Sequence, residues 1–343
     1  TYYDIAQKEK FEKRFSNLWI GSRPTQLQGT FQILFLDFSR VGGLDRTLAE
    51  NFDDYCCGGL DDFASIYEPY YYPGFEEEMK AQYGTTNKLN FLDRKARNNG
   101  SKLYLIVDEY DNFTNVVLNE QGDKVYHALT HASGFYREIF KKFKGMFERI
   151  FMTGVSPVTL DDLTSGFNIG WNISTDHQFN MMLGFSETDV REMIQYYKDA
   201  GQLPGNTNID AMIEEMRPWY DNYCFAEESL ERDPKMFNCD MVFYYLRHYM
   251  TLGKSPKEMI DPNTRTDYNK MKKLIRLDKL DGNRKGVLRK ITEDGQIVTT
   301  LTTTFPATDI TKPEIFPSLL FYYGMLTITA TRGNYLVLSI PNN

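Results

Sequence analysis

The chain has 343 residues, enough for about two domains of ~150 residues that each bury a hydrophobic core. Its net charge of −8 argues against a general nucleic-acid-binding surface, because phosphate binding depends on clustered Lys and Arg, and leaves room for a local basic patch only. The four cysteines show no CxxC spacing. That pattern argues against a zinc site or a disulfide scaffold and predicts reduced thiols in a cytoplasmic protein.

The longest apolar stretch, residues 316–328, is interrupted by Ser318 and Gly324. It falls short of the ~18 to 20 residues that a membrane-spanning helix needs, so we expect no membrane partner. The opening sequence TYYDIAQKEKFEKRF has neither an initiator Met nor the layout of a signal peptide. We therefore interpret the sequence as a fragment of a longer protein.

The first half of the chain alternates apolar runs with helical patterns, which predicts an α/β domain with a parallel sheet. Three nearly continuous apolar runs are typical of buried parallel strands, at residues 31–38, 102–110 and 149–154. Between the last two, residues 125–147 have apolar positions at helical spacing and lysines near their end. This pattern predicts a crossover helix.

The second half predicts short helices separated by Gly, Pro and Asn. Ser186 begins a near capping box and so marks a helix start, and residues 236–252 and 316–323 predict two more helices. The runs MLTITA and YLVLSIP flank a turn that contains Gly333, which is the pattern of a β-hairpin. A helix followed by a hairpin suggests a winged-helix-like subdomain.

We predict a domain boundary in the polar stretch between residues 172 and 178. The expected fold is a three-layer α/β core with a parallel sheet over residues 1–175. A mostly helical, winged-helix-like second domain is expected over residues 176–343.

The strand ending at Val107 is followed by Asp108 and Glu109, which is the layout of a Walker B motif. Ligands of open α/β sheets bind beyond the carboxyl ends of the strands, so an acid there can meet a phosphate-bound Mg²⁺. We expect Asp108 to hold Mg²⁺ through a water, and Glu109 to orient the water that attacks the γ-phosphate of ATP. Taken alone, the same pattern also fits an ordinary strand that ends at a solvent-exposed turn.

Polar residues at two other strand ends extend the candidate site. Thr153 and Ser156 follow the third strand, where ATPases of the AAA type carry a polar sensor that faces the γ-phosphate. Asp37 and Ser39 end the first strand at the same expected edge. The alternative in each case is ordinary turn chemistry, because these residue types are common where strands turn.

Several segments, taken in order, closely resemble the bacterial AAA-ATPase-like family: LFLDFS, LIVDEYDN, FMTGVSPVTLDDLTSGFNI, LGFSETDV, WYDNYCF, LLFYYGMLTI and YLVLSIPN. The resemblance implies a P-loop NTPase-like core of the AAA/STAND kind that uses ATP and Mg²⁺. Because a PD-(D/E)xK nuclease-like domain often follows in that family, it also implies nucleic acid or a nuclease domain as candidate partners. It matches Asp108 and Glu109 to the Walker B acids and adds Asp111, the second acid of the DEYD signature, to the nucleotide-binding residues.

The sequence departs from that family in its phosphate-binding loop. Family members carry a Walker A loop with an RPRRFGKS-like sequence, whose helix runs into a segment much like the opening of this chain. A GKS triplet begins at Gly253, but His248 stands where the loop needs a glycine, and no strand precedes it. Gly253 instead predicts a helix end, and Ser255, Pro256 and Glu258 predict the start of the next helix.

Three other features have simpler explanations than a functional site. His127 and His131 lie one helical turn apart, but HALTH lacks the acid of a zinc-binding HExxH motif. The aromatic residues of 65–79 lack interleaved Arg or Lys, which favours packing within a loop or against a partner over base stacking. Arg217 could act as a second γ-phosphate sensor or simply stack on a neighbouring ring.

The leading hypothesis is an ATPase module whose Mg²⁺-dependent activity belongs to the intact protein, with this fragment inactive alone. The alternative is a non-catalytic interaction or regulatory module of a nuclease-associated protein. A GxxxxGK[ST] sequence upstream of Thr1 separates the two hypotheses, because only the ATPase needs it.

Overall fold

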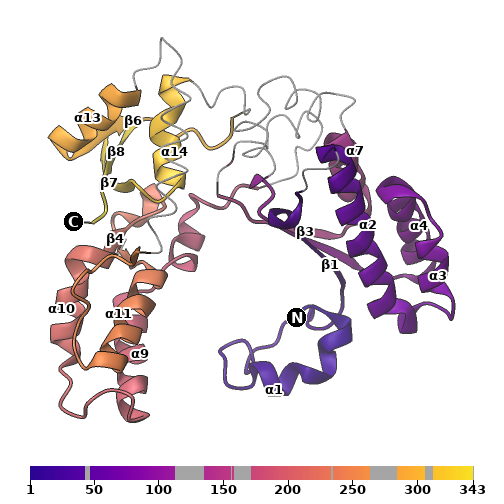
Figure 1. Ribbon diagram of the computed structural model, residues 1–343, viewed down its shortest axis with the longest axis horizontal. Coiled ribbons are helices and arrows are strands. Elements are labelled where there is room, and N and C mark those ends of the chain that lie inside the picture. Colours follow the sequence, from indigo (N-terminus) through magenta and orange to yellow (C-terminus); the bar gives the residue numbers. More distant parts are fainter. Residues whose placement is uncertain are drawn as a thin grey trace. The chain divides into compact units, whose positions relative to one another are not determined.

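The computed structural model describes residues 1–42, 47–112, 135–155, 157, 171–232, 235–262, 284–305 and 312–342. The chain divides into two compact units, Thr1–Asn168 and Ile169–Asn343 (Figure 1). Within the described ranges, no helix is both long and apolar enough to cross a membrane.

The described part of the first unit is built on a parallel sheet with the strand order β1-β2-β3. Its strands are β1 (Gln32–Asp37), β2 (Leu103–Asp108) and β3 (Arg149–Met152). The three predicted strands are therefore confirmed to within two residues at each end. Leu34 pairs with Leu105 and Leu105 with Ile150, so an apolar row crosses the whole sheet.

Helices, among them α2 (Leu48–Tyr67), cover one face of the sheet (Figure 1). A Cβ added to Gly59 of α2 would lie 2.8 Å from Leu36, so this helix lies directly on β1. The capping box of Thr47 and Glu50 fixes where α2 begins. Besides the strands, the described elements of the unit are η1 (Ile5–Lys10), α1 (Phe11–Phe15), η2 (Phe38–Arg40), α2 (Leu48–Tyr67), η3 (Glu68–Tyr70), α3 (Phe75–Lys80), α4 (Gly84–Asn99) and α7 (Phe135–Met146).

The described helices bear on two further predictions for this unit, the crossover helix and the packing of the aromatic stretch. The crossover helix is seen as α7, and residues 125–134 of the predicted segment lie outside the described ranges. The aromatic stretch 65–79 packs inside the unit, where Tyr71 stacks on Phe75 with ring centroids 4.0 Å apart. Its rings therefore belong to the core under α2, α3 and α4.

The opposite face of the sheet is only partly covered. Phe35 is 54% exposed there, and its row neighbours Ile106 and Phe151 are partly exposed. At the start of the strands, Tyr3 packs on Tyr104 with ring centroids 5.8 Å apart. The described residues thus show two of the three predicted layers, a sheet with helices on one face.

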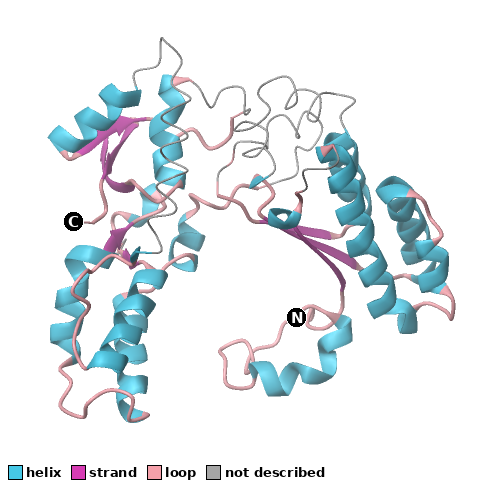
Figure 2. Ribbon diagram, viewed as in Figure 1, coloured by secondary structure: helices cyan, strands magenta, loops and turns pink. Residues whose placement is uncertain are grey.

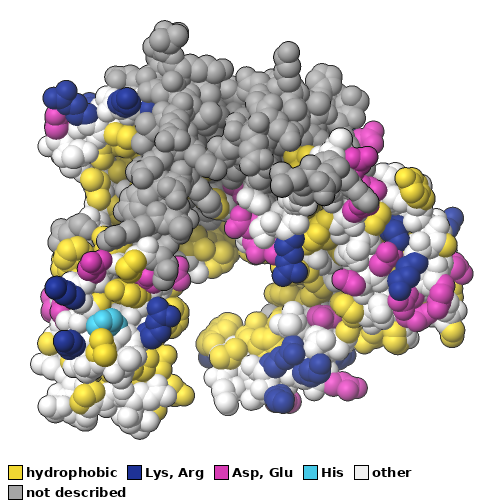
Figure 3. Space-filling model, in the orientation of Figure 1, with side chains coloured by type: hydrophobic (Ala, Val, Ile, Leu, Met, Phe, Trp, Pro, Cys, Tyr) yellow, Lys and Arg dark blue, Asp and Glu magenta, His cyan; other side chains and the backbone are white. Residues whose placement is uncertain are grey.

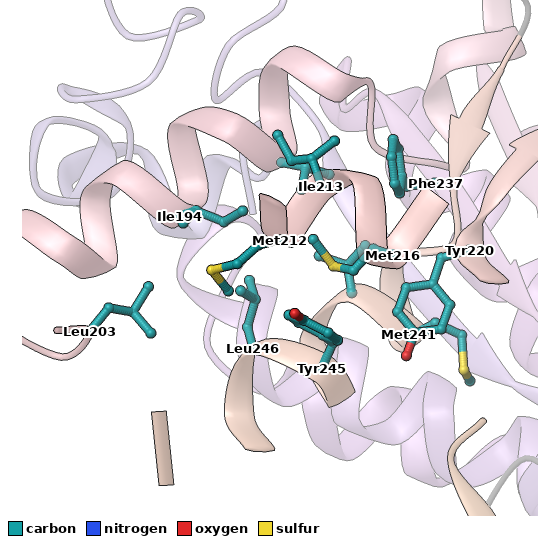
Figure 4. Packing of buried hydrophobic residues seen from close by; sticks show 12 residues of the cluster. Ile194, Leu203, Met212, Ile213, Met216, Tyr220, Phe237, Met241, Tyr245 and Leu246 are labelled. Carbon is teal, nitrogen blue, oxygen red and sulfur yellow. The ribbon is translucent and has the colours of Figure 1, made fainter. Parts of the chain in front are cut away.

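The second unit contains a bundle of α9 (Glu187–Asp199), α10 (Ile209–Tyr220) and α11 (Cys239–Leu252). Figure 4 shows its buried core, in which Ile194, Met216 and Leu246 come from the three helices. The helix start at Ser186 is confirmed, since its hydroxyl accepts a hydrogen bond from the Asp189 backbone N–H in a capping box. The prediction of a helix from residue 236 was wrong by three residues, because β5 (Met236–Phe237) pairs with β4 (Asp221–Tyr223) before α11 begins.

A second core in this unit lies between α13 (Arg284–Asp294), α14 (Phe316–Tyr322) and an antiparallel sheet with the order β6-β8-β7 (Figure 2). The strands are β6 (Gln296–Thr299), β7 (Thr327–Arg332) and β8 (Tyr335–Ser339). The predicted hairpin is observed as β7 and β8, with Gly333 in the left-handed conformation. The short helices η4 (His177–Met182), η5 (Glu227–Ser229) and η8 (Pro313–Ile315) complete the described elements.

Gly253 ends α11 in the left-handed conformation, as predicted for a helix C-terminus rather than a P-loop. The helix predicted to follow it is not formed over residues 255–260. Two tyrosines explain the difference, because Tyr244 Oη donates to the Glu258 carbonyl at 2.9 Å and Tyr220 Oη to the Met259 carbonyl at 2.6 Å. These bonds hold the segment against α10 and α11 as a loop.

Candidate functional site

The parallel strands of the first unit end at one edge, and polar side chains stand at each end. Asp37 is the last residue of β1 and is the direct register partner of Asp108, the last residue of β2. Thr153 follows β3, and its backbone N–H donates to the Val107 carbonyl at 2.9 Å. The fold therefore brings together three predicted site residues from separate parts of the sequence.

The Asp108 carboxylate is oriented by two donors. The Thr153 hydroxyl donates to Asp108 Oδ1 at 2.5 Å, and the Glu109 backbone N–H donates to the same oxygen at 3.0 Å. Among the described residues, Asp108 Oδ2 has no hydrogen-bond partner. A carboxylate that is fixed through one oxygen and open at the other is suited to bind a hard cation.

Glu109 occupies an unusual backbone conformation, with φ at 53°. The left-handed region is uncommon for a residue with a Cβ, and such conformations cluster at functional sites. The turn is held on both sides, because Tyr110 N–H donates to the Thr153 carbonyl at 3.0 Å and Asn112 N–H to the Glu109 carbonyl at 2.9 Å. These bonds fix the Glu109 backbone directly after Asp108 at the strand edge.

Asp111 lies beneath this edge and is fully buried. Its Oδ1 accepts a hydrogen bond from the Val155 backbone N–H at 3.1 Å, which ties the loop after β3 to the turn after β2. A Cβ on Gly154 would lie 2.5 Å from the same oxygen and 2.7 Å from the Tyr110 ring. Only glycine leaves room for this contact.

Two residues that support the turn were not identified from the sequence. Gly154 ends the third predicted strand, and its role depends on the distant Asp111. Tyr136 of α7 donates its hydroxyl to the Tyr110 carbonyl at 2.9 Å. It lies within the predicted crossover helix, but no local pattern distinguishes this hydroxyl from an ordinary apolar-face tyrosine.

Asp37 is engaged mainly by its own turn. Its Oδ1 accepts hydrogen bonds from the Ser39 backbone N–H at 3.0 Å and the Ser39 hydroxyl at 2.6 Å, and Arg40 pairs with Oδ2 at 3.1 Å. Hydrogen bonds from the Ser39 hydroxyl and the Ser39 backbone N–H, followed by the charge of Arg40, hold the pKa of Asp37 below its usual value. Asp37 thus caps η2 at the predicted edge, next to Asp108.

Other predicted residues lie elsewhere. Ser156, His127 and His131 are outside the described ranges. Arg217 belongs to the second unit, where it pairs with Glu187 at 2.9 Å, Glu214 at 3.1 Å and Asp221 at 2.7 Å. These carboxylates, Glu187 first, raise the pKa of the Arg217 guanidinium.

Arg217 also lies over the ring of Phe237, 6.0 Å from its centroid. The predicted stacking alternative is therefore observed, on a ring of β5 that is distant in sequence.

Comparisons with known proteins bear mainly on the first unit. No curated protein matches the chain. Among solved structures, the crystal structure of Cdc6p from Pyrobaculum aerophilum is similar over 99% of this chain and 82% of its own, at 10% identity and a TM-score of 0.29. A TM-score this low carries no argument about either unit. Residues 1–164 match the family model AAA-ATPase_like, described as "Predicted AAA-ATPase".

Proposed function

We propose that the first unit carries the Mg²⁺- and water-binding part of an ATPase site, at the carboxyl edge of its parallel sheet. One observation carries the proposal, the Asp108 carboxylate held by Thr153 from the neighbouring strand. A strand edge with an oriented acid is where ligands of open α/β sheets bind. The match of residues 1–164 to a predicted ATPase family supports the same function.

The donor set at this edge fits Mg²⁺, which prefers carboxylate, hydroxyl and water oxygens. Asp108 would hold the ion through Oδ2, the oxygen that the described residues leave open. When bound with ATP, the ion neutralises the charge that develops on the transferred phosphoryl group. Asp37 stands next to Asp108 but already binds Ser39 and Arg40, so we assign it to shaping the edge.

The remaining residues act on the water and on the geometry. Glu109, presented by its left-handed turn, accepts a proton from or orients the attacking water. Thr153 holds Asp108 and lies exposed at the strand end, where its hydroxyl could exchange the hydrogen bond to Asp108 for one to the γ-phosphate and so act as a sensor. Asp111 is buried, so it serves as a positioning residue for the loop after β3 rather than as a direct nucleotide ligand.

The 343 residues contain no GxxxxGK[ST] loop, so an ATPase site at this edge would need phosphate-binding backbone from outside them. The partly exposed sheet face supports this, because parallel sheets are normally covered on both faces. By strand alternation Asp108 shares that face with Tyr104 and Ile106. A further element packed there would bring its own residues next to Asp108.

A helix is the element that best fits this face. Tyr3 already packs on Tyr104 at the far end of the strands, so an upstream segment would reach the face from there. The six residues of β2 span about 20 Å, which a helix of about 13 residues matches. Such a helix would begin at the Asp108 edge, where its amino-terminal N–H groups could bind phosphate.

For the second unit we propose a lid of α9 to α11 and a winged-helix-like part, supported by the order of α14 and the hairpin of β7 and β8. The boundary proposed from the sequence, at residue 175, lies a few residues beyond the division into compact units after Asn168. We also propose a cytoplasmic location, because all four cysteines are free thiols, as is typical of proteins in a reducing compartment. Nucleic acid and a nuclease domain remain proposed partners of the longer protein.

The test is a Glu109→Gln variant of the full-length protein. If Glu109 orients the water, the variant keeps Mg-ATP binding and loses turnover by about 10²- to 10⁴-fold, the usual contribution of a positioned acid or base. Glu148→Gln is the matched control, since Glu148 lies before β3 at the opposite edge of the sheet and should be neutral.

Normal turnover in Glu109→Gln would remove Glu109 from the site. Upstream codons without a GxxxxGK[ST] sequence would favour the non-catalytic interaction module instead.

A further inference from the structure

The segment between the start of the chain and β1 carries a charge opposite to that of the rest of the molecule. Residues 8–23 contain five basic side chains and two acidic ones, a net charge of +3 in a chain whose net charge is −8. The basic residues are Lys8, Lys10, Lys13, Arg14 and Arg23. All five are exposed, and none of them forms an ion pair within the described ranges.

An exposed apolar pair lies within the same segment. Trp19 is 71% exposed and Leu18 is 53% exposed. The Arg23 guanidinium lies over the Trp19 ring, 5.1 Å from its centroid. Figure 3 shows Lys and Arg side chains gathered over α1 with hydrophobic side chains beside them. We call residues 8–23 the basic-aromatic segment.

This surface is held in place by its own small core. The Tyr2 ring packs against Phe11 and Phe15, with centroids 6.0 and 5.5 Å away. The Tyr2 hydroxyl accepts a hydrogen bond from the Thr25 backbone N–H at 2.7 Å, which closes the loop. The buried Tyr2 ring and the partly buried Phe11 and Phe15 rings thus hold the backbone of the segment, while Trp19 stays exposed.

The arrangement of the cations suits an extended anion. Lys13 and Arg14 stand three and four residues after Lys10, spacings at which each can lie beside Lys10 on the surface of a helix. Trp19 adds a flat exposed ring, and the Arg23 guanidinium lies over one face of that ring. Clustered cations beside an exposed aromatic ring are the two parts of a single-strand binding surface, which follows the backbone with charge and stacks bases on rings.

We propose that the basic-aromatic segment binds single-stranded nucleic acid, with Trp19 stacking on a base and Lys10, Lys13 and Arg14 contacting phosphates. Duplex fits less well, because its bases are already stacked and closed to a protruding ring. The segment lies at the end of the sheet away from Asp108, since Asp4 bridges Phe31 just before β1 begins. Its binding therefore needs neither ATP nor Mg²⁺.

The test uses the 343-residue chain and a fluorescein-labelled oligothymidylate of about twelve nucleotides, within the site sizes of single-strand binders. Anisotropy at low salt should show binding that Trp19→Ala weakens by about ten-fold or more. Trp171→Ala is the matched control, because Trp171 is 69% exposed in the other unit and should leave affinity unchanged. Binding of the strand should also quench the intrinsic tryptophan fluorescence of the wild-type protein but not that of Trp19→Ala.

The charge contribution is tested by salt dependence. Lys13→Gln with Arg14→Gln should reduce the slope of log affinity against log salt by about 1.4, at ~0.7 per phosphate contact on a single strand. Lys285→Gln with Lys290→Gln, two exposed cations of α13, should not change it.

Absence of binding at low salt would overturn the proposal. So would an unchanged Trp19→Ala affinity, or equal binding of duplex or polyglutamate, which would mean a general polyanion surface. Binding of anionic phosphatidylserine vesicles in place of the strand would assign the surface to a membrane instead. Because no nucleotide is added, none of these results depends on the ATPase proposal.

Discussion

Two charged clusters of the molecule use their carboxylates differently. In the second unit, Arg217 binds Glu187, Glu214 and Asp221 at once, and Asp221 is only 2% exposed. In the first unit, Asp108 is held by a hydroxyl and a backbone N–H, both on Oδ1, with no cation paired to it among the described residues. The carboxylates of the second unit share a guanidinium, whereas the Asp108 carboxylate is oriented by neutral donors alone.

The difference separates structural charge from charge kept for a ligand. A buried carboxylate paired with a guanidinium stabilises the fold only while its partner is present. An oriented carboxylate at a strand edge contributes little to stability and retains its charge for a cation. Variants of the two clusters should therefore differ in what they damage.

The largest expected effect on stability is that of Arg217→Met. The substitution keeps the packing on Phe237 but leaves the buried Asp221 without its guanidinium. We expect a loss of about 2–3 kcal/mol in the free energy of unfolding, below the 3–5 of a fully buried pair because Arg217 is 34% exposed. Urea denaturation measures it.

Arg191→Met is the control for that variant, because Arg191 pairs with Glu187 and Asp210 in solvent. It should change the urea midpoint little. Equal losses in the two variants would contradict a special role for the buried Asp221.

A second stability effect is expected at the turn beneath Asp108. Gly154→Ala places a methyl group 2.5 Å from Asp111 Oδ1, so the loop after β3 has to move. We expect a cost of about 1–3 kcal/mol, the range for overpacking. Gly145→Ala in α7 has nothing within 4 Å of its Cβ and should be neutral or stabilising. If both variants unfold at the same urea concentration, the contact with Asp111 does not require glycine at position 154.

A smaller effect is expected when the candidate metal ligand itself is changed. In Asp108→Asn the amide oxygen can still accept from Thr153 and from the Glu109 N–H, so both bonds persist. The free energy of unfolding should change by less than about 1 kcal/mol. A loss as large as that of Arg217→Met would show that Asp108 is structural and would break the distinction between the clusters.

The smallest expected effect is on the stability of the protein at low pH. Hydrogen bonds from Arg217 and then Arg191 hold the pKa of Glu187 below its usual 4.5. A carboxylate with a lowered folded-state pKa stabilises the protein above pH 4.5, and that contribution is lost as the pH falls through the folded-state value. The difference in melting temperature between wild type and Arg217→Met should therefore narrow below about pH 4.5. A difference that stays constant from pH 7 to pH 3.5 would exclude this linkage.

The sequence predicted those parts of the fold whose signals are local. Each parallel strand is a nearly continuous apolar run, and the Ser186 capping box lies within four residues of sequence. The strand β5 was missed because its two residues carry no periodicity and depend on pairing with β4. The loop after Gly253 was predicted as a helix because its sequence has the residue types of a helix start. Tyrosine hydroxyls from α10 and α11 instead donate hydrogen bonds to its carbonyl groups.

For the candidate site, too, the sequence predicted the residues with local signals and missed the contacts between distant segments. Strand ends located Asp108, Thr153 and Asp37, since parallel strands end at one edge. The burial of Asp111, the clearance at Gly154 and the ion pairs of Arg217 depend on contacts between distant segments. No spacing within the sequence encodes those contacts.

The most direct test of the account is the melting temperature of the full-length protein with ATP, with and without Mg²⁺, for wild type and Asp108→Asn. A ligand that binds only the folded state raises stability with its concentration. We predict a Mg²⁺-dependent rise in wild type that is largely lost in Asp108→Asn. No rise in wild type, or the same Mg²⁺-dependent rise in both proteins, would contradict a magnesium-nucleotide site at Asp108.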